Sequence, residues 1–241
     1  MPKTNRAQVS IAYDAIRDQI LSYALLPGAP LSDNQLSREL NMSRAPIREA
    51  VLLLQMDGLV QINEKGQPRV SPVCYDDISD ILTVRCALEA EAIRIIARAG
   101  WLTEVQEQEL VQIHQAYTSS AENLSEHYRY DDLFHQKLAE FSGSPRISNI
   151  LSQMRLQMLR ARWLNLANPK RRENAIEEHT RLLSALQAHN EPEAVQALLD
   201  HLNNSRSAFY TVLNDKQMHA LATAIRVFHS ANDTSSDAVK N

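Results

Sequence analysis

Four residues in the C-terminal two thirds of the chain have the types and spacing of a metal site. Asp131 and His135 stand four residues apart in YDDLFHQKLAEF, a segment with helical periodicity, so both side chains lie on one helix face. His179 and His201 lie in two later segments that also predict helices. If these helices pack together, one carboxylate and three imidazoles can meet. That ligand set suits zinc or another divalent transition metal and leaves positions for water or a ligand.

A second group of residues could bind phosphate. SRAPIREAV, residues 43–51, predicts the start of a helix, with Ser43 as an N-cap whose hydroxyl accepts from the first turn and Pro46 within that turn. Arg44 and Arg48 are four residues apart and therefore project from one face. Cations at a helix N-terminus oppose the macrodipole, whereas a phosphate would be stabilised by both the dipole and the guanidinium groups.

The elements expected around these arginines form a winged helix-turn-helix. Periodicity and turn residues predict helices over 10–24, 33–40 and 44–57, followed by extended segments at 59–63 and 68–73. The EKGQ turn with Gly66 joins the extended segments into a hairpin. In a winged helix-turn-helix the third helix enters a DNA groove. The residues expected to face inward on the first helix are Ile11, Ala15, Ile16, Ile20 and Leu21.

LSDNQLSRELNMSRAPIREAVLLLQMDGLVQINEKGQPRVSPV resembles the DNA-binding domain of GntR-type bacterial transcription regulators. The features that carry the resemblance are the preceding LPGAPLS, the QLSRELNMSRAPIREA helix-turn-helix and the DGLV that leads into the wing. In that family, arginines at the start of the recognition helix contact phosphates and guanine edges, and a wing glycine lets the hairpin tip enter the minor groove. The resemblance implies DNA contacts by Arg38, Ser43, Arg44, Arg48 and Gly66.

Two departures from the family pattern limit what can be inferred about the operator. Asn34 stands where some relatives have an arginine, and the wing reads EKGQPR rather than a run of small residues. The alternative for Arg44 and Arg48 is that both are solvated surface residues, as arginines on an arbitrary helix usually are.

From Tyr75 onward the sequence predicts six antiparallel helices with short loops, which make an all-α bundle. Asp76 or Asp77 is expected to cap the first helix, and Thr103 and Gln106 have the spacing of a capping box for the second. The first of these predicted helices ends at Gly100. The other five span 104–120, 124–141, 145–166, 169–189 and 191–213. We therefore expect a mainly α protein with a winged helix-turn-helix over 1–73, a helical effector and dimerisation domain over 74–230 and a disordered tail over 231–241.

The pattern D-x-x-F-H, then E-H, then D-H-L resembles the FCD effector domain of the FadR-like branch of the GntR family. In many such domains one aspartate and three histidines bind a metal, and a small carboxylate completes its coordination. The resemblance implies a divalent transition metal, zinc first, with nickel, manganese or iron as alternatives. The matching ligands are Asp131, His135, His179 and His201.

Two neighbours of this group have open or different roles. Arg85 resembles the arginine that FCD domains place near the effector, and a salt bridge to Glu89 at i+4 is an equal alternative. Asp132 should point about 100° away from Asp131, since a helix has 3.6 residues per turn.

Composition narrows the class of protein. The 241 residues include only five glycines and 5% aromatics with 44% hydrophobic residues, which favours a helix-rich fold. No run approaches the roughly 20 apolar residues of a membrane span, and MPKTNRAQ is not a signal peptide. Two cysteines are too few for a disulfide scaffold, so a cytoplasmic protein is expected. The net charge of −4 says little about DNA, so individual arginines carry that argument.

The leading hypothesis is a transcription regulator, not an enzyme, that binds a palindromic operator as a homodimer and responds to a small carboxylate effector. Repression is the expected direction, although the residues do not decide between repression and activation. A metal-dependent hydrolase is the first rival; it needs a general base, and Glu178 lies about 100° round the helix from His179. The second rival is a constitutive DNA-binding protein with a purely structural metal. Effector, operator and metal species stay open.

Overall fold

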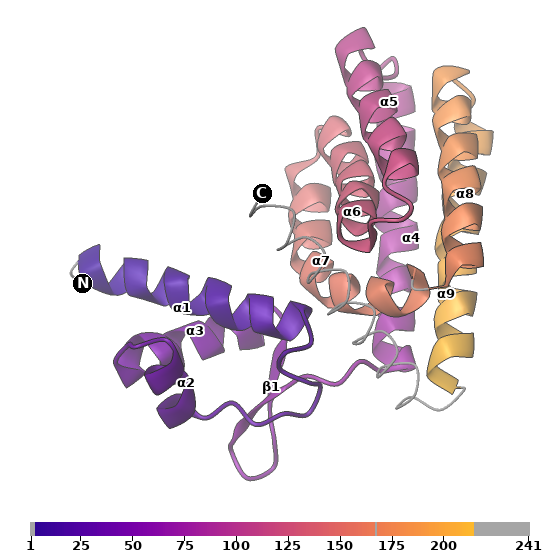
Figure 1. Ribbon diagram of the computed structural model, residues 1–241. Helices are drawn as coiled ribbons and strands as arrows, with labels where there is room; N and C mark the ends of the chain where they lie inside the picture. Colours follow the sequence, from indigo (N-terminus) through magenta and orange to yellow (C-terminus); the bar gives the residue numbers. More distant parts are fainter. Residues whose placement is uncertain (1–2, 167, 215–241) are drawn as a thin grey trace, which may run out of the picture. The chain divides into compact units, whose positions relative to one another are not determined.

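The structure is a computed structural model that describes residues 3–166 and 168–214, and the chain divides into two compact units at Val73 and Cys74. Helices dominate the described residues, with one small two-stranded antiparallel sheet in the first unit (Figure 1). The mainly α fold class is thereby confirmed. The predicted tail over 231–241, and the predicted effector domain beyond residue 214, lie outside the described residues.

The first unit is a winged helix-turn-helix. Helix α1 packs on α3, α2 packs on α3, and the strands β1 and β2 pair so that Val60 faces Val70. The wing is the short turn between these strands. The elements are α1 (Lys3–Leu21), α2 (Asp33–Glu39), α3 (Arg44–Met56), β1 (Val60–Ile62) and β2 (Pro68–Val70).

Helix α1 differs from the prediction at its start and in its buried face. It begins at Lys3 rather than near residue 10, because residues 3–9 hold no proline or glycine that would stop it. Ile16 and Ile20 are buried as predicted, whereas Ile11, predicted to face inward with them, is 56% exposed and Ala12 is fully buried instead. The buried stripe thus lies about 100° round from Ile11, one residue further along the helix.

The N-terminus of α3 also differs in one respect. Ser43 occupies the N-cap position with extended backbone, as predicted, but its hydroxyl makes no capping hydrogen bond. An N-cap side chain usually accepts from the second or third residue of the helix, and here the third is Pro46, which has no N–H. The Ser43 hydroxyl is therefore left at the exposed end of the helix.

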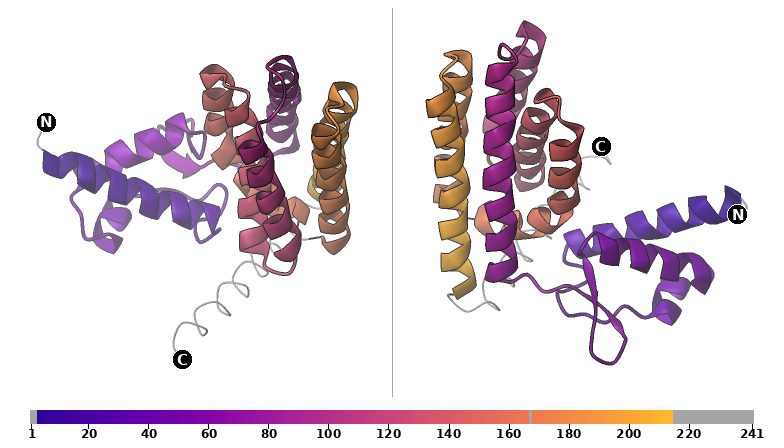
Figure 2. Two further views of the ribbon diagram at one scale, coloured as in Figure 1. Left: turned by 90° about the horizontal axis from the view of Figure 1, so that it is seen from above. Right: turned by 180° about the vertical axis from the view of Figure 1, so that it is seen from behind.

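The second unit is a bundle of helices. Helix α4 packs against α6, α7 and α9, while α8 packs against α5 and α9. Figure 2 shows the bundle from two further directions. The bounds are α4 (Tyr75–Arg98), α5 (Glu104–Ser119), α6 (Leu124–Phe141), α7 (Pro145–Leu166), α8 (Pro169–Gln187) and α9 (Glu191–Asn214).

The caps of these helices mostly follow the prediction. Thr103 and Gln106 form the expected capping box at α5. The N-cap of α4 is Cys74, two or three residues before the expected Asp76 or Asp77. Asp76 and Asp77 lie inside its first turn, where their charge favours the helix dipole.

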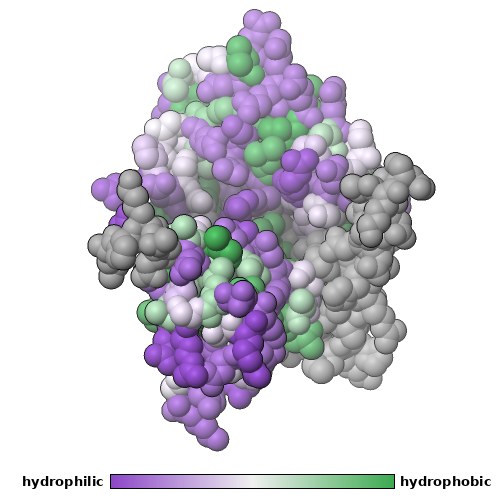
Figure 3. Space-filling model, turned by 60° about the vertical axis from the view of Figure 1, so that its left-hand side comes forward, coloured by the Kyte–Doolittle hydropathy of each residue, from purple (hydrophilic) through white to green (hydrophobic). Residues whose placement is uncertain are grey.

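The face in Figure 3 is mainly hydrophilic, and its hydrophobic residues form separate small patches. Within the described residues, no helix combines the length and the apolar character that crossing a bilayer requires. Cys74 and Cys86 are free thiols.

Candidate metal centre and DNA-contact face

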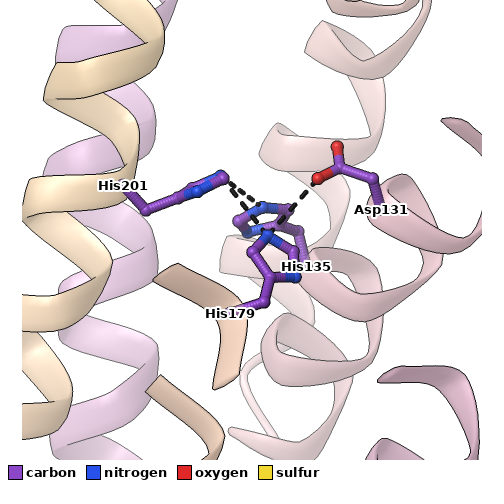
Figure 4. A group of neighbouring side chains, drawn as sticks. All are labelled: Asp131, His135, His179 and His201. Atoms are coloured by element: carbon purple, nitrogen blue, oxygen red, sulfur yellow. Dashed lines mark hydrogen bonds and ion pairs between the residues drawn. The ribbon is translucent and has the colours of Figure 1, made fainter. Parts of the chain in front are cut away.

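The second unit brings Asp131, His135, His179 and His201 together, as Figure 4 shows. One ligand atom from each lies within 4.8 Å of the others, and all four residues are buried. The Nε2 atom of His201 is 3.3 Å from Nε2 of His135 and 3.4 Å from Nε2 of His179. The Oδ1 atom of Asp131 is 3.3 Å from Nε2 of His179. Three imidazole nitrogens and one carboxylate oxygen therefore face one point.

Three helices supply these side chains. Asp131 and His135 come from one face of α6, His179 from α8 and His201 from α9. The neighbouring Asp132 points elsewhere and accepts a hydrogen bond of 2.9 Å from Arg155 of α7. The close packing of α8 against α9 brings the two later histidines together, although 22 residues separate them in the chain.

One buried and one half-buried carboxylate set the tautomers of two histidines. His135 Nδ1 donates to Glu89 Oε2 at 2.7 Å, and His201 Nδ1 donates to Glu178 Oε2 at 2.8 Å. An ionised carboxylate only accepts, so the proton of each ring is on Nδ1 and the Nε2 lone pair faces the cluster. Burial lowers the pKa of His135, and burial together with His179 lowers the pKa of His201 to about 3, so both rings are neutral.

This arrangement fits a divalent transition metal. Two Nε2 lone pairs 3.3 Å apart repel each other, and a cation between them turns the repulsion into attraction. Two nitrogens bound to one zinc ion at about 2.0–2.1 Å stand roughly 3.0–3.4 Å apart, which matches the spacing of the histidine pairs. The hydrogen bonds from Nδ1 to carboxylates are the outer contacts typical of metal-binding histidines.

Each of the two carboxylates is in turn held by an arginine. Arg85 Nε donates to Glu89 Oε1 at 2.5 Å, and Arg171 Nη2 donates to Glu178 Oε2 at 2.9 Å. Burial alone would raise the pKa of Glu89, but Arg85 and His135 together hold it well below its ordinary value. The result is two parallel chains of contacts, Arg–Glu–His, that both end at the cluster.

Sequence reasoning found only part of these chains. The Arg85–Glu89 pair at i+4 was one of the two roles considered for Arg85, but the contact of Glu89 with His135 spans 46 residues and has no local signal. Glu178 was considered only as a general base and judged poorly placed. The structure puts its carboxylate behind His201, where it also accepts from Arg171.

Arg171 was missed altogether. Its side chain is buried, and Nη2 donates to Glu178 and to Ser205 Oγ. Its Nε and Nη1 atoms have no hydrogen-bond partner among the described residues. The same is true of His179 Nδ1, whose ring instead packs against Phe134 with ring centroids 4.8 Å apart. The sequence gives no local signal for this contact, because Arg171 and Glu178 are seven residues apart and helical ion pairs are expected at three or four.

A cavity of about 190 Å³ lies beside the cluster, between α4, α6 and α7. Arg85, Glu89 and His135 line its inner end. A smaller cavity of about 20 Å³ borders Asp131, His201 and Arg171, and Arg85 lines this one too. Arg85 is thus both paired with Glu89 and adjacent to space that a ligand can occupy.

In the first unit, Arg44 and Arg48 are exposed at the start of α3 and line one surface depression with Asn34 and Gln67. The side chain of Arg48 is 64% exposed, and its Nε donates to Asp33 at 2.5 Å. Neither arginine is buried against its own unit, so both are available to an external ligand.

The other residues expected to contact DNA are exposed as well. Arg38 donates from Nε to the carbonyl oxygen of Asn34 at 3.1 Å, within α2. Gly66 lies at the tip of the wing with a φ of +73°, a conformation that glycine adopts without strain. Ser43, the N-cap residue of α3, is exposed too.

Comparison with known proteins agrees with this architecture. Residues 8–70 match the bacterial regulatory proteins of the gntR family, and residues 80–204 match the FCD domain. The chain therefore belongs to the GntR family of bacterial regulators and carries an FCD domain. Members are DNA-binding transcription regulators rather than enzymes, and their FCD domains bind small-molecule effectors.

Individual relatives cover most of the chain. The HTH-type transcriptional regulator YdhC of Bacillus subtilis is 26% identical over 205 residues, 84% of this chain and 91% of that protein. The transcriptional repressor RspR of Escherichia coli is 27% identical over 192 residues, 79% and 83% of the two chains. The solved structure of E. coli McbR/YncC matches with a TM-score of 0.70 at 23% identity. The match covers 85% of this chain and 97% of that one, which shows the shared fold.

Proposed function

We propose that this regulator senses a small carboxylate at a metal centre in its helical domain and thereby changes its affinity for DNA. The observation that carries the proposal is the set of Nε2 lone pairs that Glu89 and Glu178 direct at one point. The metal ligands are Asp131, His135, His179 and His201. Zinc is the first choice, with nickel, manganese or iron as alternatives, because imidazole and carboxylate suit all of them.

The proposed division of labour follows the two units. The winged helix-turn-helix over 1–73 binds the operator, and the helical domain from residue 74 onward binds the effector and forms the dimer. A homodimer presents two recognition helices to the half-sites of a palindromic operator. The regulator works in the cytoplasm, where bacterial DNA lies, and represses its target genes as the named repressor RspR does its own.

DNA contact is assigned to the exposed residues around α3. Arg44 and Arg48 reach phosphates and guanine edges, Arg38 contacts phosphate, and Ser43 and Gly66 approach the backbone at the helix start and the wing tip. The exposure of these residues supports the assignment. Arg48 exchanges its contact with Asp33 for a contact with DNA.

In the effector domain, a bound divalent ion supplies Lewis-acidic positions for a carboxylate oxygen. Arg85 donates to the carboxylate from the wall of the cavity, and Glu89 and Glu178 keep the protons of His135 and His201 on Nδ1. The effector changes operator affinity only by its differential affinity for two arrangements of the dimer.

The test combines metal, carboxylate and DNA. Genomic fragments selected by the purified protein provide the duplex, and fluorescence anisotropy measures its Kd for zinc-loaded and chelator-treated protein with and without a panel of carboxylates. At least one carboxylate should change the Kd of the zinc-loaded protein and lose this effect after chelation. If no carboxylate changes the Kd, the metal is structural and the sensing proposal fails.

A further inference from the structure

One ion pair lies in the surface depression at the start of α3. Arg48 Nε of α3 donates to Asp33 Oδ2 of α2 at 2.5 Å, although 15 residues separate the two in the chain. Both residues line the depression, together with Arg44. Among the described residues that line it, Asp33 is the one carboxylate. An acidic group therefore lies between the arginines assigned to DNA contact and any DNA that approaches them.

The stability of the unit does not account for this contact. Asp33 is in the first turn of α2, where its charge favours the helix dipole whether or not it reaches an arginine. The same helix end is already capped by Ser32, whose side chain accepts from the backbone N–H of Gln35. The side chain of Arg48 is 64% exposed, and an ion pair so open to water adds little to the free energy of folding. The contact therefore concerns what Arg48 binds.

A carboxylate at this position makes phosphate contacts less favourable. Duplex DNA carries one negative charge per roughly 1.7 Å of its axis, and nonspecific binding depends almost entirely on cations that neutralise phosphates. Asp33 neutralises the charge of Arg48 before DNA arrives. A phosphate that takes Arg48 from Asp33 replaces one anion by another, and it leaves the released carboxylate beside the negatively charged backbone.

A base edge in the major groove offers more than a phosphate does. Guanine presents O6 and N7 as two acceptors, so the guanidinium of Arg48 gains two hydrogen bonds for the one that it loses. The released carboxylate of Asp33 can accept from the N4 amino group of a cytosine, whereas a phosphate has no donor to offer it. Only a sequence that supplies these groups compensates both side chains.

From these observations we infer that Asp33 is a specificity-determining residue of the DNA-binding unit. It withholds Arg48 from phosphates and releases it to a guanine edge, so it weakens binding to other DNA more than binding to the operator. The inference rests on the proposed function, because it takes Arg48 to contact DNA.

Asp33→Asn tests the inference, because it removes the charge and keeps the size of the side chain. Fluorescence anisotropy measures the Kd of full-length, zinc-loaded protein for the selected operator duplex and for a scrambled duplex of the same length and composition. The variant should bind the scrambled duplex about 5-fold more tightly at about 0.15 M salt, the effect of one additional phosphate contact. Operator affinity should rise by a smaller factor, so the ratio of the two affinities falls.

The dependence on salt provides a second measurement. With one more phosphate contact, the slope of log K against log salt for the scrambled duplex should steepen by about 0.9. If Asp33 only supported the fold of the unit, its replacement would instead weaken binding to both duplexes.

Asp18→Asn is the matched control. Asp18 is an exposed carboxylate of the same unit that also pairs with an arginine, Arg17 at 2.8 Å, and it does not line the depression. The same change of charge there should leave the affinity ratio close to that of the wild type. Asp33→Glu keeps the carboxylate and should bind the scrambled duplex more weakly than Asp33→Asn does.

The Arg48→Ala background shows whether Asp33 acts through Arg48. If it does, adding Asp33→Asn to Arg48→Ala should change binding to the scrambled duplex at low salt no more than Asp18→Asn does. An undiminished effect in that background would mean that the carboxylate repels DNA by itself, and would overturn the inference.

The remaining failures are distinguishable. Unchanged operator affinity in Arg48→Ala would refute the DNA contact of Arg48, and this inference with it. If Arg48→Ala loses operator binding but Asp33→Asn and Asp18→Asn have equal affinity ratios, this inference alone is wrong. A weaker operator complex in Asp33→Asn with unchanged binding to the scrambled duplex would also overturn it, because Asp33 would then orient Arg48 toward the base.

Discussion

His201 of α9 donates a hydrogen bond of 2.8 Å from Nδ1 to Glu178 Oε2 of α8, on the side of the ring away from the other histidines. The same carboxylate oxygen accepts from Arg171, and the other oxygen accepts from Asn204. These contacts hold the pKa of Glu178 below its ordinary value in spite of its burial, so the carboxylate stays ionised. An ionised Glu178 makes His201 a neutral ligand with its lone pair directed at the cluster.

Glu178→Gln should therefore weaken zinc binding by roughly 10- to 100-fold, the usual effect of losing an outer partner of a metal-binding histidine. Competition with a chromogenic chelator measures the Kd. Glu177→Gln is the control, because Glu177 is exposed and one position round the helix. Equal zinc affinity in the two variants would contradict the role of Glu178.

Asp131 and Asp132 offer a second matched pair. Asp131→Asn removes an anionic ligand atom and should weaken zinc binding by more than the roughly 100-fold upper limit for an outer partner. Asp132→Asn should leave the zinc Kd within a few-fold, because this side chain pairs with Arg155 instead. The same chelator competition distinguishes them, and a larger effect of Asp132→Asn would reverse the ligand assignment.

His179→Ala tests the metal stoichiometry. Protein purified without chelator should contain about one transition-metal ion per chain by elemental analysis, and the variant should retain only a small fraction of it. His189→Asn is the control: it also removes one histidine, at an exposed position with a φ of +53° that asparagine tolerates. Full metal content in His179→Ala would remove His179 from the ligand set.

Arg48→Ala should abolish operator binding at protein concentrations that saturate the wild type, since one bidentate arginine–guanine contact contributes about 1–3 kcal/mol and phosphate contacts add to it. Anisotropy with the selected duplex measures the loss, and zinc content should not change. Arg98→Ala changes the charge equally at an exposed position of α4 and should have little effect. Unchanged affinity in Arg48→Ala would refute the assignment of the recognition helix.

Two details of the first unit were predicted wrongly: the buried face of α1 and the hydrogen bond of the α3 N-cap. Ile11 was expected to be buried because it is apolar, but the buried face depends on how α1 packs on α3, and Ala12 is buried while Ile11 is exposed. The Ser43 hydroxyl was expected to accept a hydrogen bond from the first turn of α3, but Pro46 has no N–H to donate, and this could have been read from the sequence.

The sequence by itself determined the features that depend on neighbours within about one helical turn. These include the helices and their order, the capping box of Thr103, and the placement of Asp131 and His135 on one face. Only the tertiary structure decided which distant side chains meet: Glu89 behind His135, Glu178 and Arg171 behind His201, and the polar cavity between α6 and α7. The reason is physical, since a helix sets the direction of a side chain relative to its own axis, whereas its partners depend on how helices pack and turn against one another.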